Sequence, residues 1–291
     1  MSWQSFAGTV IGEDLAWKRP AAPIGSEEVT RSTLSAQRPA LEVHRRAPAV
    51  DDGRPPLLFV HGLGHGAWCW EHWLAAAADA GYPAYAVSLR GHGGSPGRLR
   101  TARLGQYVDD VVATAESLPR PPVLVGHSMG GLVVQQALAR YAARAAVLVA
   151  PIPATPAVPS LVAIARRHPL DALRIVVGGS LPLRADYLFH ELAPADAHRH
   201  TDRCHGESAV VQYQLLLHKP AGKPLGAPPV LVLATPDDRL IPIRGIRATA
   251  ARYGATLREF PGMGHDLMLD ARWREPFEAM TAWLRTAVPA A

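Results

Sequence analysis

Short apolar runs alternate with amphipathic stretches along most of this chain. Strand-like runs, most of them rich in Val, Leu and Ala, occur at 41–45, 57–60, 84–89, 123–125, 146–150, 230–233 and 256–260. Helical periodicity falls between them, at 104–118, 132–138, 243–252 and 273–284. Apolar strands that alternate with helices form a mostly parallel sheet covered on both faces. The pattern therefore predicts an α/β fold with a mostly parallel, doubly wound sheet.

The alternation stops between Pro151 and Pro228. This stretch begins with closely spaced prolines and continues in a mostly helical pattern. Because it is too long for an ordinary loop in a compact domain, we expect an inserted helical cap. The predicted organisation is an irregular N-terminal arm at 1–31, expected to be extended, a core formed by 32–151 and 227–291, and the cap at 152–226.

The composition is that of a globular protein, with 291 residues, 48% hydrophobic and 19% charged, and a net charge of +5. No apolar run approaches the ~20 residues of a membrane span, and no secretory signal is visible, so a cytoplasmic location is expected. The basic residues are dispersed rather than interleaved with aromatics, which disfavours a nucleic-acid partner. A small-molecule substrate is the expected partner, and the oligomeric state is left open.

Cysteine and histidine usage gives little support for metal or disulfide chemistry. Cys69 and Cys204 are too few for a disulfide framework, although one bridge between them stays open. The predicted cap holds several histidines, but His198 and His200 are two residues apart and would face different sides of a helix. No ligand pattern such as Cys-x-x-Cys accompanies them. We therefore predict no metal and no cofactor.

A candidate nucleophile stands in the sequence Gly126-His-Ser128-Met-Gly130. An apolar strand pattern precedes this G-x-S-x-G motif, and a helical pattern follows it. Such a strand–turn–helix arrangement exposes the serine hydroxyl at the top of the sheet. It also places the serine at a helix N-terminus, where the helix dipole favours developing negative charge. The motif predicts that Ser128 is a catalytic nucleophile.

A serine hydroxyl needs a general base that is oriented by an acid. His265 stands in a Gly-rich loop that follows the predicted strand at 256–260, at the carboxyl edge of the sheet. Asp237 and Asp238 follow the strand at 230–233 and offer two carboxylates at the same edge. We favour Asp238 as the acid that orients His265.

Acyl transfer also needs donors for the oxyanion. The strand at 57–60 ends in the Gly-rich sequence His61-Gly-Leu63-Gly-His-Gly66, where glycines let the backbone approach a substrate. The backbone N–H groups of Leu63 and Met129 are the expected donors.

Together these motifs resemble the α/β-hydrolase fold superfamily, in the family's order and over roughly residues 41–288. They are highly specific for the fold and less specific for the reaction. The resemblance implies that the acid is the aspartate of D-x-x-x-P, which here is Asp238, followed by Pro242. It also implies the oxyanion roles of Leu63 and Met129. The segment at 65–70 is similar to the lid-bearing subset of plant esterases and hydroxynitrile lyases, but no lysine marks this chain as cyanogenic.

The expected function is serine-dependent hydrolysis of an ester, thioester or lactone of a moderately hydrophobic small molecule, through an acyl-enzyme. One alternative keeps the fold but changes the reaction to that of a lyase, a carbon–carbon hydrolase or a cyclase in a natural-product pathway. Another is a non-enzymatic ligand-binding module, which would need no complete triad. Serine at position 128 disfavours chemistry that uses an aspartate nucleophile.

Overall fold

The computed structural model describes residues 28–31 and 40–288 of the chain. Eight strands within these residues form one sheet, in the order β1-β2-β4-β3-β5-β6-β7-β8. Their bounds are β1 Glu28–Arg31, β2 Glu42–Arg46, β3 Leu57–Val60, β4 Ala84–Val87, β5 Val123–His127, β6 Ala145–Val149, β7 Val230–Ala234 and β8 Thr256–Glu259. The β1–β2 and β2–β4 pairs are antiparallel, and all the others are parallel. The predicted mostly parallel α/β sheet is confirmed.

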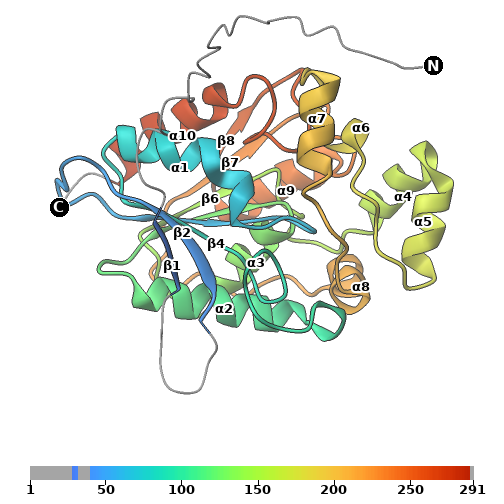
Figure 1. The fold of residues 1–291 in the computed structure, drawn as a ribbon, viewed down its shortest axis with the longest axis horizontal. Coiled ribbons are helices and arrows are strands. Elements are labelled where there is room, and N and C mark those ends of the chain that lie inside the picture. Colours follow the sequence, from blue (N-terminus) through green and yellow to red (C-terminus); the bar gives the residue numbers. More distant parts are fainter. Residues whose placement is uncertain (1–27, 32–39, 289–291) are drawn as a thin grey trace, which may run out of the picture.

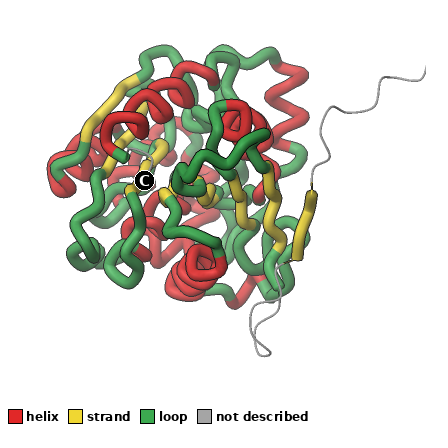
Figure 2. The backbone as a smooth tube through the Cα atoms, turned by 90° about the vertical axis from the view of Figure 1, so that its left-hand side faces the viewer, coloured by secondary structure: helices red, strands yellow, loops and turns green. Residues whose placement is uncertain are grey.

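Helices cover both faces of the sheet. Helices α1 (Glu71–Asp79) and α10 (Arg274–Ala287) lie over one face, and α2 (Leu104–Ser117) and α3 (Met129–Ala137) lie over the other (Figure 1). Helix α9 (Ile243–Tyr253) packs against β7. The side view shows strands between helices, with β1 at the edge of the sheet (Figure 2). Strands β3, β5, β6 and β7 are buried along their whole length, which explains why they are apolar at nearly every position, His127 at the end of β5 excepted. None of the described helices has the length and apolar character needed to cross a bilayer.

The structure departs from the sequence prediction in two places. Glu28–Arg31, placed in the N-terminal arm by the sequence, forms strand β1 and pairs with β2, so the sheet begins earlier than expected. Residues 1–27 of the predicted arm lie outside the described residues. Helix α1 was not predicted, because its run of alanines weakens the amphipathic pattern. Its buried side chains are Trp73, Leu74 and Ala77.

Five helices occupy the segment between β6 and β7, at one side of the molecule (Figure 1). They are α4 (Val158–Arg167), α5 (Pro169–Val176), α6 (Ala185–Leu188), α7 (Pro194–Thr201) and α8 (Ala209–Leu217). Prolines stand in the first turns of α4, α5 and α7. Proline is favoured there because its fixed φ suits a helix start and its missing N–H would have no partner within the helix. Prolines of this segment thus initiate three of its helices as well as interrupting the α/β pattern.

Contacts from both halves of this segment attach it to the core. The Asp266 N–H donates to the Leu188 carbonyl oxygen, with 3.0 Å between N and O. The His205 N–H donates to the carbonyl oxygen of Gly64, also at 3.0 Å. Asp266 follows His265, and Gly64 follows Leu63. The helical segment therefore contacts the two loops that carry the predicted base and one predicted oxyanion donor.

Two 3₁₀ helices, η1 (Ala67–Trp70) and η2 (Leu99–Thr101), complete the described elements. Cys69 in η1 is buried with a free thiol, and Cys204 is also free. The bridge that the sequence left open between these cysteines is therefore not formed.

Candidate active site

Ser128 occupies a sharp turn between β5 and α3. Its φ of 52° and ψ of −116° are rare for a residue with a side chain. Holding such a conformation costs about 1–3 kcal/mol, which the surrounding structure must offset. The flanking glycines are required for close packing, because a Cβ on Gly126 would lie 2.4 Å from the Gly130 carbonyl oxygen. A Cβ on Gly130 would lie 2.4 Å from the carbonyl oxygen of Val60. The G-x-S-x-G spacing is therefore dictated by strand and helix contact.

His265 is paired with Asp238. The His265 Nδ1–H donates to Asp238 Oδ2, with 2.6 Å between the two atoms, and both side chains are buried. The other carboxylate oxygen of Asp238 accepts the backbone N–H groups of Leu240 and Ile241, at 2.8 and 2.9 Å. These bonds fix the orientation of the carboxylate. The proton on Nδ1 leaves Nε2 as the free acceptor of a neutral His265.

Asp237 occupies a different environment from Asp238. It is exposed, and its Oδ2 accepts the backbone N–H of Gly262 at 2.8 Å. Its own N–H donates to Thr235 Oγ1. Asp237 thus stabilises the turn after β7 rather than contacting His265.

Leu63 and Met129, the predicted oxyanion donors, both lie beside Ser128. Met129 is the first residue of α3, so its N–H belongs to the helix N-terminus that follows Ser128 directly. The loop after β3 lies against the same residue, because a Cβ on Gly62 would be 3.1 Å from Ser128 Cβ. Leu63 and Ser128 line the same cavity.

This cavity lies between the core and the helical segment. Ser128, His265, His65, His127, Ser160 and Gln212 provide its polar lining. The remaining side chains are all aliphatic: Leu63, Ile152, Ala157, Leu161, Ile164, Ile175, Leu181, Leu183, Leu188, Leu215, Leu216, Leu240 and Ile241. Two other apolar residues of the segment do not line this cavity, because Leu173 is 55% exposed and Phe189 is buried in the core. An apolar chain fits this lining.

A second buried histidine–aspartate pair, missed by the sequence analysis, lies next to His265. His65 Nε2 is 3.0 Å from Asp266 Oδ2, and His65 Nδ1 is 2.8 Å from the Leu63 carbonyl oxygen. Because both neighbours are acceptors, both ring nitrogens of His65 donate, as in an imidazolium. Burial opposes this charge, but Asp266 outweighs it and raises the pKa of His65 well above its usual value. His65 therefore links the loop of Leu63 to the loop of His265.

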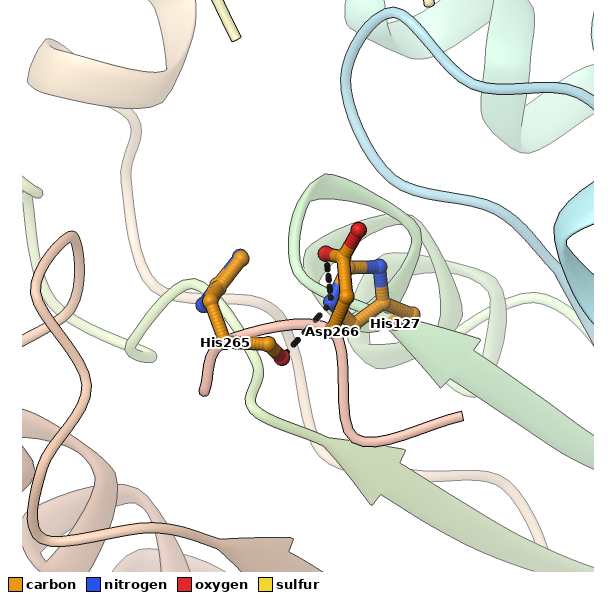
Figure 3. Close-up of side chains that lie close together, drawn as sticks. All are labelled: His127, His265 and Asp266. Atoms are coloured by element: carbon orange, nitrogen blue, oxygen red, sulfur yellow. Dashed lines mark hydrogen bonds and ion pairs between the residues drawn. The ribbon is translucent and has the colours of Figure 1, made fainter. Parts of the chain in front are cut away.

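His127 completes this buried group. Its Nε2 lies 3.2 Å from the main-chain oxygen of His265 and 3.4 Å from Asp266 Oδ1 (Figure 3). Burial lowers the pKa of His127 to about 3, so the ring is neutral and donates from Nε2. Burial also disfavours the Asp266 carboxylate, yet His65 holds its pKa at about 2. His65, Asp266 and His127 thus form a buried hydrogen-bonded group that contacts the backbone of His265.

Three of these residues lie close enough together to be considered as metal ligands. His127, His265 and Asp266 offer ligand atoms that all lie within 4.8 Å of one another. However, Asp266 is ion-paired with His65, whose positive charge would repel a divalent cation. His265 directs its Nδ1 at Asp238. This donor set does not fit a metal ion.

If His265 is the base, as the sequence predicts, its electrostatics set the pH dependence of the reaction. Burial lowers the pKa of His265, but Asp238 and then Asp266 outweigh it, so the pKa lies above the usual 6.5. A base must be neutral, so kcat/KM is expected to rise with pH and to level off above this raised pKa. We call this rising part of the pH profile the acid limb. Asp266→Asn should move this acid limb to lower pH, because Asp266 raises the pKa of His265 more than the nearby His65 charge, which itself depends on Asp266, lowers it. The measurement is kcat/KM of a neutral ester between pH 4 and 9.

Asp237→Asn is the control, and it should leave the limb in place. A limb that stays unchanged in folded Asp266→Asn protein would contradict this electrostatic interpretation.

Comparison with known proteins places this arrangement in a family. The Alpha/beta hydrolase family model matches residues 57–279, most of the chain. The chain belongs to the α/β hydrolase family. The match includes Ser128, Asp238 and His265.

Two relatives illustrate the range of similarity of this α/β hydrolase. The probable esterase PIR7A of Oryza sativa subsp. indica is 43% identical over 96 residues, which are 32% of this chain and 36% of the rice protein. The chain thus spans about a third of the length of that relative. The monoacylglycerol lipase of Mycolicibacterium smegmatis is 28% identical over 251 residues, covering 80% of this chain and 89% of the lipase.

Solved structures agree on the fold. A thermophilic esterase from Thermogutta terrifontis superposes with a TM-score of 0.67 at 20% identity, over 90% of this chain and 99% of that one. A monoacylglycerol lipase from Paleococcus ferrophilus gives a TM-score of 0.64 at 24% identity, over 84% and 98%.

Proposed function

We propose that this α/β hydrolase cleaves an ester, thioester or lactone of a moderately hydrophobic small molecule through an acyl-enzyme. The observation that carries the proposal is the pairing of His265 with Asp238 at 2.6 Å, in a cavity that His265 shares with Ser128. Relatives called esterase and monoacylglycerol lipase support ester hydrolysis.

The proposed reaction uses each group in a defined order. His265 Nε2 takes the proton from Ser128 Oγ as this oxygen attacks the substrate carbonyl carbon. The resulting oxyanion accepts hydrogen bonds from the N–H groups of Leu63 and Met129. When the tetrahedral intermediate collapses, the bond to the leaving alcohol or thiol breaks, and His265 donates its proton to the leaving atom. Water, deprotonated by His265, then releases the acid from Ser128 by the reverse steps.

Asp238 stabilises the His265 imidazolium that forms transiently in each half-reaction. The buried support from His65 and Asp266 contributes by holding the Leu63 loop and the His265 loop at a fixed separation. We propose that residues 152–226 act as a cap that excludes water and binds the apolar part of the substrate.

The cap proposal predicts a change in chain-length selectivity. Ile175 on α5 lines the cavity, whereas Leu173 on the same helix is exposed. Ile175→Ala should lower kcat/KM for esters whose acyl chain reaches it by about 10-fold relative to acetyl esters, because lost apolar contact is worth ~1–3 kcal/mol. The measurement is kcat/KM across p-nitrophenyl esters of increasing acyl length.

Leu173→Ala is the matched control. With these esters, used at concentrations where they stay dissolved, it should keep the chain-length profile of the parent protein. An unchanged profile in both folded variants would mean that α5 only packs against the core.

A further inference from the structure

Exposed apolar side chains are concentrated on helices α4 and α5. Of the ten large hydrophobic residues exposed in the described part of the chain, six lie between 158 and 177. They are Val158, Val162, Leu170, Leu173, Val176 and Val177, which we call the α4–α5 face. Leu170 and Val177 are 77% and 72% exposed. Such a concentration marks an interaction site rather than ordinary scattered surface residues.

The spacing aligns these residues along each helix. Val158 and Val162 are four apart, while Leu170 and Leu173 are three apart, so each pair shares one side of its helix. The buried sides of the same helices supply Ile164 and Ile175 to the substrate cavity. A helix at a protein surface normally presents polar residues outward. Here the outward side is apolar as well.

The exposed charged side chains on the two helices are all arginines. Arg166, Arg167 and Arg174 are exposed. The one carboxylate within residues 158–177, Asp171, is buried and forms an ion pair with Arg184 at 2.6 Å. Apolar side chains with arginines beside them suit a surface that is hydrophobic inside and negatively charged outside.

We propose that the α4–α5 face docks on the surface of an anionic phospholipid membrane. A second copy of the chain fits less well, because two arginine-bearing faces would repel each other. A protein partner also fits less well, because the six apolar residues include none of the aromatic side chains or methionines that are enriched at such interfaces. The docked helices are those that line the aliphatic cavity, so this arrangement would hold the cavity next to a source of acyl chains.

Vesicle flotation tests the docking independently of catalysis. The purified full chain is mixed with vesicles of phosphatidylcholine alone, or of phosphatidylcholine with 30% phosphatidylglycerol. The wild type is expected to float with the anionic vesicles, less with the neutral ones, and less when salt is raised to 0.5 M. Leu170→Gln with Leu173→Gln should weaken the partitioning by about tenfold or more, since both side chains lose the gain from apolar burial. Arg166→Gln with Arg167→Gln should remove most of the preference for anionic vesicles.

Val50→Gln is the matched control, because Val50 is 74% exposed but lies far along the chain from α4 and α5. It should bind vesicles as the wild type does. All variants should hydrolyse a short soluble ester at the wild-type rate, which separates docking from the proposed reaction. The proposal is overturned if the wild type floats with neither vesicle, or if the leucine variant floats as well as the wild type. It is also overturned if the wild type does not bind vesicles but forms a dimer, seen by light scattering, that the leucine variant abolishes.

Discussion

Ser128→Ala is expected to lower kcat for ester hydrolysis by about 10⁶-fold, the scale seen when a triad nucleophile is removed. The reason is that the Ser128 hydroxyl is the group proposed to form the acyl-enzyme. The folded structure should survive, because alanine removes only a hydroxyl and the φ of 52° is already enforced by the packing around Gly126 and Gly130. The measurement is single-turnover and steady-state kinetics with an activated ester.

Ser160→Ala is the matched control, because Ser160 lines the same cavity from α4. It should change kcat by no more than severalfold. Near-normal turnover by the Ser128 variant would contradict the assignment, and a comparable loss in the Ser160 variant would redirect it.

Asp238→Asn is expected to lower kcat by about 10⁴-fold. Asp238 Oδ1 accepts the N–H groups of Leu240 and Ile241, so the asparagine oxygen will keep that position. The amide NH₂ then faces His265 Nδ1, which must become an acceptor. The proton moves to Nε2, and His265 can no longer take the proton of Ser128. Steady-state kinetics at the pH of maximum activity measure this loss.

Asp237→Asn is the neighbouring control. Its side chain holds the Gly262 N–H and does not contact His265, so the variant should stay within a few-fold of wild type. A large loss in Asp237→Asn with a mild one in Asp238→Asn would reverse the assignment of the acid.

The fold could be predicted from sequence because its central strands are covered on both faces. This burial makes β3, β5, β6 and β7 apolar at nearly every position, so they stand out as short runs between helices. Edge strand β1 gives no such signal. Its place in the sheet depends on pairing with β2, which sequence periodicity does not record.

The candidate site was predictable where one local motif carries the information. Ser128 is marked by the strand–turn–helix pattern, and His265 by its Gly-rich loop after β8. The sequence offered both Asp237 and Asp238, and in the structure Asp238 is the one that contacts His265.

The support from His65 and Asp266 was missed because 201 residues separate the two in the sequence. The available signal was weak: His65 closes the glycine-rich loop after β3, and Asp266 directly follows the predicted base. The pairing depends on how these two loops meet at the carboxyl edge of the sheet.

The most direct test of the account is to locate the covalent intermediate. The protein is mixed with a p-nitrophenyl ester, quenched in acid during the first turnover, digested and analysed by mass spectrometry. A serine-directed phosphonate serves as a stable stand-in for the acyl group. The account predicts an acyl or phosphonyl mass on the peptide that contains Ser128, and none in Ser128→Ala. A modification at another residue, or turnover by protein that never carries an acyl group, would contradict it and favour the lyase, carbon–carbon hydrolase or cyclase alternative.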